Sequence, residues 1–110
     1  MDRLKDVIAE KGLKLFAIID HSAEAAAHGL ELRETKVVIF GSPTAGTAVM
    51  RAAPPAALDL PLKVLVWDDE GQTTITYAPP SELAARYELD DDLAARLAGI
   101  DLVTDAVLED

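Results

Sequence analysis

Residues 36–53, KVVIFGSPTAGTAVMRAA, contain the strand-to-helix transition on which the predicted fold is centred. The run 36–40 is continuously apolar and rich in β-branched residues, which is typical of an interior strand. Ser42 offers a side-chain oxygen suited to a helix N-cap. Pro43 suits the first helical position, because the N–H that proline lacks would be unpaired there anyway. We therefore expect a strand over 36–40 and a helix from Pro43 to about Ala53.

Gly41 and Gly46 have the G-x-x-x-x-G spacing of a phosphate-binding loop. Thr47 and Ala48 follow, where such a loop needs a lysine to offset phosphate charge and a hydroxyl to ligate magnesium. A kinase or ATPase is therefore excluded. Two interpretations remain open: a helix start whose free N–H groups bind a small anion, or a capped turn that serves the fold alone.

The segments on either side are predicted from their periodicity. Residues 13–19, LKLFAII, are apolar on both faces apart from Lys14 and are expected to form a buried strand. Residues 62–67 and 72–77 alternate around the turn DDEG, which predicts a hairpin. The proline-rich stretch PPAALDLP between the central helix and this hairpin is expected to be a loop or a short turn of helix.

Helices are expected near both ends of the chain. Residues 2–11 are amphipathic, and residues 21–29 follow two plausible N-caps, Asp20 and Ser22, and end at Gly29. Ser81 is expected to cap a helix over SELAARY, and Gly99 is a possible break in the last helical region. The acidic run at positions 90–92 is interpreted as the solvated start of a helix. The apolar stripe of the last helical region is Leu93, Leu97, Ile100, Val103 and Val107.

Together these segments predict one domain, 1–110, of the α/β (α+β) class. It is expected to be a two-layer sandwich in which helices cover a small mixed sheet of about four strands. If the helix at 21–29 is a right-handed crossover, the first two strands are parallel. The Asp20–His21 turn and the Gly41–Thr47 loop would then meet at one edge of the sheet.

The bulk composition excludes several classes of function. A net charge of −10 and a pI near 4.4 disfavour nucleic acid and anionic lipid as partners. The absence of cysteine excludes disulfides and thiolate metal sites. No apolar run approaches the roughly 20 residues that cross a membrane. A soluble, cytoplasmic protein without a membrane or nucleic-acid partner and without a cofactor is expected.

His21 and Asp59 are the candidate catalytic residues. His21 follows a strand and stands beside Asp20, so it could act as a general base, or Asp20 could simply cap a helix. Asp59 would join it only if its strand runs antiparallel to the 36–40 strand. His28 lies seven residues from His21, too far along a helix for both to ligate one metal, and no third ligand accompanies Glu24 and His28. No metal site is therefore predicted.

The ordered set of Asp20–His21, LELRETKVVIFGSP, GTAVM and DLPLKVLVW resembles the Domain of Unknown Function 302 family. The resemblance extends over about Gly12 to Tyr77. It implies a small α/β sandwich, often a homodimer, with no established activity. Members usually have Asn where this chain has Ser42, and often have a strand before the first helix. Here that edge strand is expected to be missing or supplied by a partner.

Three functions remain open. The leading hypothesis is a homodimeric module that binds a small anionic ligand at the 20–21 and 41–47 loops. An enzyme that uses His21 as a general base is the second, and a purely structural or interaction module is the third. The candidate ligand-binding residues are Asp20, His21, Gly41, Ser42, Gly46 and Thr47.

Overall fold

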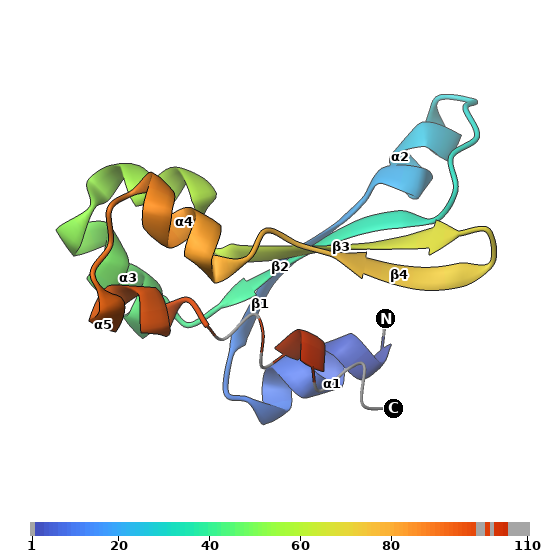
Figure 1. The fold of residues 1–110 in the computed structure, drawn as a ribbon. Helices are drawn as coiled ribbons and strands as arrows, with labels where there is room; N and C mark the ends of the chain where they lie inside the picture. The colour runs from blue at the N-terminus through green and yellow to red at the C-terminus, as the bar shows by residue number, and fades with distance from the viewer. Residues whose placement is uncertain (1, 99–100, 102, 106–110) are drawn as a thin grey trace.

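In the computed structural model, which describes residues 2–98, 101 and 103–105, the chain forms one four-stranded sheet (Figure 1). The strands are β1 (Lys14–Asp20), β2 (Thr35–Gly41), β3 (Leu62–Asp69) and β4 (Gln72–Thr76). Their order in the sheet is the order in the chain, and each neighbouring pair is antiparallel. The α+β class, the four strands and the hairpin at 62–77 are confirmed, but the sheet is antiparallel throughout and not mixed.

The helices occupy three places around this sheet. Helices α3, η1, α4 and α5 gather at one end of the sheet, α2 lies at the opposite end, and α1 lies beside β1 (Figure 1). The bounds are α1 (Asp2–Glu10), α2 (His21–Ala27), α3 (Pro43–Ala52), the 3₁₀ helix η1 (Pro54–Asp59), α4 (Pro80–Arg86) and α5 (Asp91–Arg96).

The core lies on one face of the sheet. Val38 and Phe40 of β2 are fully buried there, because alternate residues of a strand share a face. Helix α1 covers this face with an apolar stripe at helical spacing, and α3 and α4 each add one buried residue. The main contributions come from Leu4, Val7, Ile8, Val38, Phe40, Val49, Leu62, Val64, Leu83, Leu97 and Val103.

The expected parallel pairing of the first two strands is wrong. β1 and β2 are antiparallel, with Lys14 opposite Gly41 and Asp20 opposite Lys36. Helix α2 buries none of its residues, since its alanine-rich sequence has no apolar stripe that could pack against the sheet. It therefore cannot serve as a crossover, and the chain turns back on itself to enter β2. The two loops predicted to meet lie at opposite ends of β1.

The helix ends follow the sequence in most cases. Asp20, Ser42 and Asp90 each accept a hydrogen bond from a backbone N–H as N-caps of α2, α3 and α5. The prediction that Ser81 caps this helix is wrong, because α4 begins at Pro80 and already includes Ser81. Its N-cap is Pro79, which has no side chain that can accept a hydrogen bond. Leu97 and Val103 of the last apolar stripe are buried, and Gly99, Ile100 and Val107 lie outside the described residues.

Candidate functional site

The turn from β2 into α3 is held closed by its own hydrogen bonds. The Ser42 Oγ accepts from the Ala45 N–H at 3.2 Å, and the Ser42 carbonyl accepts from the Gly46 N–H at 2.9 Å. Pro43 has no N–H. Of the amides at positions 43–46, the Thr44 N–H is thus the one that takes part in neither bond. A multidentate phosphate cradle needs several free amides. The backbone of this turn therefore lacks the donors of a phosphate site.

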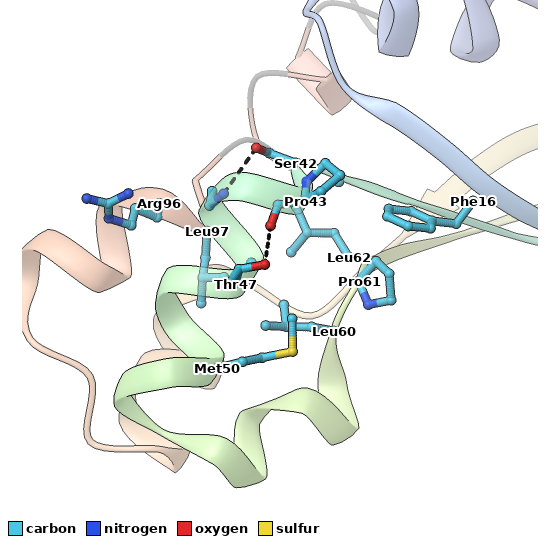
Figure 2. A pocket seen from close by; sticks show the side chains of 13 residues that line it. Phe16, Ser42, Pro43, Thr47, Met50, Leu60, Pro61, Leu62, Arg96 and Leu97 are labelled. Atoms are coloured by element: carbon cyan, nitrogen blue, oxygen red, sulfur yellow. Dashed lines mark hydrogen bonds between the residues drawn. The ribbon is translucent and has the colours of Figure 1, made fainter.

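A cavity of about 230 Å³ lies beside this turn (Figure 2). One wall is the first two turns of α3, with Gly46, Thr47 and Met50, and the Thr47 hydroxyl is occupied by a 2.6 Å bond to the Pro43 carbonyl. The other walls come from β1, the entry to β3 and the end of α5. The complete lining is Phe16, Gly41, Ser42, Pro43, Ala45, Gly46, Thr47, Met50, Leu60, Pro61, Leu62, Arg96 and Leu97.

The cavity surface is largely apolar and contains one charged residue, Arg96. The Arg96 Nε lies 3.6 Å from Asp92, one turn earlier on α5, and the arginine side chain is 42% exposed. Figure 2 shows its guanidinium at the edge of the cavity, directed away from the other labelled side chains. The cation is thus at the rim of the cavity, on a long and partly exposed side chain.

The predicted ligand-binding residues separate into two groups. Gly41, Ser42, Gly46 and Thr47 line the cavity. Asp20 and His21 lie at the far end of β1, six residues beyond the Lys14–Gly41 pair and so about 20 Å away along the strand. The structure therefore does not bring His21 and Ser42 together.

The Asp20 carboxylate forms hydrogen bonds at the start of α2. Its Oδ1 accepts from the Ser22 hydroxyl at 2.6 Å and from the Ala23 N–H at 2.9 Å. The hydrogen bond from Ser22 is the main reason that the pKa of Asp20 lies below its usual value. Lys36 approaches the same carboxylate at 3.9 Å from the neighbouring strand. Asp20 caps α2 and ties it to the sheet.

Asp59 lies at the same end of the sheet as Ser42, because β3 runs antiparallel to β2. Its carboxylate does not line the cavity. It accepts from the Arg86 guanidinium at 2.9 Å and from the Tyr87 hydroxyl, and these two bonds, the one from Tyr87 first, lower the pKa of Asp59. The same hydrogen bond raises the pKa of Tyr87. Asp59 therefore connects η1 to the end of α4 as an ionised acceptor.

Several cavity residues could not be identified from the sequence. Phe16, Leu60 and Leu97 come from separate segments and look like ordinary core residues, as does Met50. Phe16 lines the cavity although it is 42% exposed, because a bulge between Leu15 and Ala17 interrupts the pairing of β1 with β2 at this point. The alternation of the strand alone gives no sign of this irregularity.

Metal ligands and membrane-spanning helices would define two other kinds of site. Across residues 2–98, 101 and 103–105, no group of three or more histidine or acidic side chains is placed to hold a metal ion. Among the helices in that part of the chain, none combines the length and apolar character needed to cross a bilayer.

The fold and its cavity define a small α+β domain with a pocket at a strand-to-helix turn. Residues 1–107 match the family described as a domain of unknown function, DUF302, so the chain belongs to this family. The match is longer than the stretch that carried the resemblance in the sequence. A crystal structure of an uncharacterized conserved DUF302 protein from Bacillus stearothermophilus has the same fold. It superimposes with a TM-score of 0.81 over 96% of this chain and 84% of that chain, at 18% identity.

Closer relatives in sequence have a named activity. The chain is 34% identical over 109 residues to fluoride-specific ion channel FluC 1 of Brucella suis and to FluC 1 of Brucella abortus. FluC 2 of Brucella melitensis is equally similar. These alignments cover 94% of this chain but 43% of the first relative and 40% of the other two. The chain thus spans about two fifths of the length of these relatives.

Proposed function

We propose that this domain is a homodimeric module that binds a small organic anion in the cavity beside α3. The cavity itself is the observation that carries the proposal. It is a hollow of about 230 Å³ with a largely apolar lining and a few polar groups, which is the character of small-molecule sites. It is smaller than the pockets that hold drug-sized ligands. A ligand smaller than a nucleotide fits it.

The lining of the cavity favours one chemical class of ligand. Side chains such as Phe16, Met50 and Leu97 require an apolar body. In a chain with 20 acidic and 10 basic residues, the charged residue in the lining is the cation Arg96. The first turn of α3, which is the positive end of its dipole, also lines the cavity. One anionic end on an apolar body matches both features, and a short-chain monocarboxylate is the simplest such molecule.

A thermal-shift series tests this proposal. Straight-chain monocarboxylates of four to eight carbons would each be compared with the alcohol of equal length, and inorganic phosphate would serve as a compact anion. We expect the carboxylates to raise the melting temperature in a concentration-dependent way and more than the alcohols. Arg96→Gln should reduce the difference between acid and alcohol, since it removes the cation at the rim.

Gly46→Val tests the location of the site. A Cβ at Gly46 would meet the Met50 methyl group at 3.7 Å, an ordinary contact, so the added methyl groups of valine would occupy the cavity. The stabilisation by carboxylates should disappear in this variant. Leu58→Ala is a matched control, because Leu58 is 83% exposed on η1 and does not line the cavity. Unchanged stabilisation of Gly46→Val, or no stabilisation of the native chain by any compound, would contradict the proposal.

The named relatives favour a second function. We propose that the domain works together with a fluoride channel as a part that lies outside the membrane. Its similarity covers 40–43% of the channel proteins, and none of its described helices could cross a membrane. The pore of those relatives would then lie in the remainder of their chains. Deletion of the gene should make its host more sensitive to fluoride, and complementation should restore growth. Equal growth of the deletion and parent strains at all fluoride concentrations would contradict this function.

The enzyme hypothesis gains no support from the geometry. His21 and Asp59 lie at opposite ends of the sheet, and the Asp59 carboxylate is occupied by Arg86 and Tyr87. A general base needs a partner or substrate within hydrogen-bond reach. Neither residue lies among those that line the cavity.

A further inference from the structure

A second cation lies next to the cavity. The Lys14 ammonium lies over the Phe16 ring, with its Nζ 5.1 Å from the ring centroid. This distance is within the roughly 6 Å over which a cation is attracted to the face of an aromatic ring. Because Phe16 lines the cavity, the ammonium is held against a side chain of the cavity wall.

The backbone of Lys14 is fixed at the same place. Lys14 is the antiparallel partner of Gly41, which lines the cavity and directly precedes the Ser42 cap. Partner residues in such a pair have their Cα atoms about 5 Å apart. The Lys14 side chain is exposed, so its ammonium stays in water while its stem follows the surface. Its position beside the cavity thus depends on strand pairing as well as on the contact with Phe16.

Lys14 and Arg96 flank the cavity from different sides. Lys14 and Phe16 belong to β1, whereas Arg96 is the last residue of α5. In Figure 2, Phe16 and Arg96 lie at opposite sides of the labelled group, with Leu62 between them. The lining residues, all within the part of the chain that the structure describes, include no acid. The cavity is therefore an apolar hollow between two cations, in a chain with a net charge of −10.

We infer that the ligand of this cavity is a dianion, a straight-chain α,ω-dicarboxylate with one carboxylate at Lys14 and the other at Arg96. This inference rests on the proposed binding of an organic anion and adds a second anionic group to the ligand. An ammonium has three N–H donors, so Lys14 can keep its contact with Phe16 and donate to a carboxylate. The Arg96 guanidinium has five donors, of which the Nε donor faces Asp92.

The rest of the cavity suits the chain between the two carboxylates. Met50, Leu60 and Leu62 present apolar surface, and methylene groups are stabilised by leaving water for such surface. Both cations are partly exposed, so each carboxylate can bind without losing all of its water. Charge pairs at exposed positions contribute modestly, and the second pair should therefore raise the affinity by about fivefold.

Calorimetric titration with matched ligands tests the inference. Dicarboxylates of six to nine carbons would each be compared with their own half methyl ester, which keeps the chain and removes one charge. The best dicarboxylate should bind the native chain about fivefold more tightly than its half ester. Lys14→Gln should bring this ratio close to one, and Lys14→Arg, which keeps the charge, should retain it. Lys5→Gln makes the same change in net charge at an exposed position of α1, outside the cavity lining, and should also retain the ratio.

The outcomes separate this inference from the proposed function. A half ester that binds the native chain as tightly as its dicarboxylate would overturn the dianion and leave the binding of a monoanion intact. A preference for the dicarboxylate that survives in Lys14→Gln would rule out Lys14 as the second cation and so overturn the inference. Failure of every monocarboxylate and dicarboxylate to bind would overturn both proposals. Circular dichroism of each variant would confirm its fold, so that a lost ratio reports on the charge alone.

Discussion

The Ala45 amide donates a 3.2 Å hydrogen bond to the Ser42 hydroxyl oxygen, and this bond closes the start of α3. The glycine spacing around it is that of a phosphate loop, but the helix start is capped by its own side chain. The feature that makes the turn resemble an anion site in sequence therefore serves the helix. The site that we propose for a ligand is the hollow beside this turn, which is lined mainly by apolar side chains.

Ser42→Ala should destabilise the protein by about 1 kcal/mol, because it leaves the Ala45 amide without its acceptor. Chemical denaturation with urea measures this difference. Ser42→Asn is the control, since asparagine caps helices as well as serine does, and it should stay within a few tenths of a kcal/mol of the native chain. Equal losses in both variants would show that the cap is not the cause.

Gly46→Ala should raise the stability of the native chain by about 0.5–1 kcal/mol. The position is helical, and the new Cβ would meet Met50 at an ordinary 3.7 Å. A Tm measurement would detect the gain. The same methyl group narrows the cavity, so carboxylates should stabilise this variant less than they stabilise the native chain. A loss of stability on this change would indicate closer packing at Gly46 than the structure shows.

The contacts of Asp59 predict a stability that depends on pH at the acidic end. The pKa of Asp59 is lowered in the folded chain, so its contribution is complete above its unfolded value of about 3.9 and is lost as the pH falls through the lower folded value. Asp59→Asn should therefore be less stable than the native chain at pH 6, and this difference should shrink below about pH 4. Unfolding curves from pH 2.5 to 7 would test this. A difference that is constant across this range would rule out the ion pair as its source.

His21→Ala should leave ligand binding in the cavity unchanged. His21 is the first residue of α2 and directly follows β1. That end of β1 is about 20 Å along the strand from the Lys14–Gly41 pair. The thermal shift with carboxylates measures this. Arg96→Gln, at the rim of the cavity, serves as the comparison that should lose part of the shift. A loss of binding on His21→Ala would require a second ligand site near α2.

The local elements of this fold could be predicted from the sequence because their signals are local. Ser42 and Pro43 define the start of α3, and the turn before Gln72 defines the hairpin, each through the backbone preferences of neighbouring residues. Strand direction depends instead on whether α2 packs on the sheet. Its alanine-rich sequence offers too little apolar surface for such packing, so α2 stays off the sheet and the two strands are antiparallel.

Part of the candidate site could likewise be predicted from local signals. Gly41, Ser42, Gly46 and Thr47 belong to one continuous motif and do line the cavity. Phe16 and Leu97 reach it from β1 and from the end of α5, and their apolar character is the same as that of the core. No pattern along the chain distinguishes an apolar residue that lines a hollow from one that fills the interior.

The order of the strands predicts which amides of the sheet are best protected from hydrogen exchange. Every strand pairs only with the strands next to it in the chain, and β2 and β3 are paired on both sides while β1 and β4 have one free edge. Local unfolding exposes the amides of the edge strands before those of the central strands. The amides of Val38 and Val64 should therefore exchange with deuterium among the slowest in the chain, and the β1 amides on either side of its bulge among the fastest in the sheet. Phe16, which lines one side of the cavity, thus lies on one of the two edge strands and next to the bulge in β1.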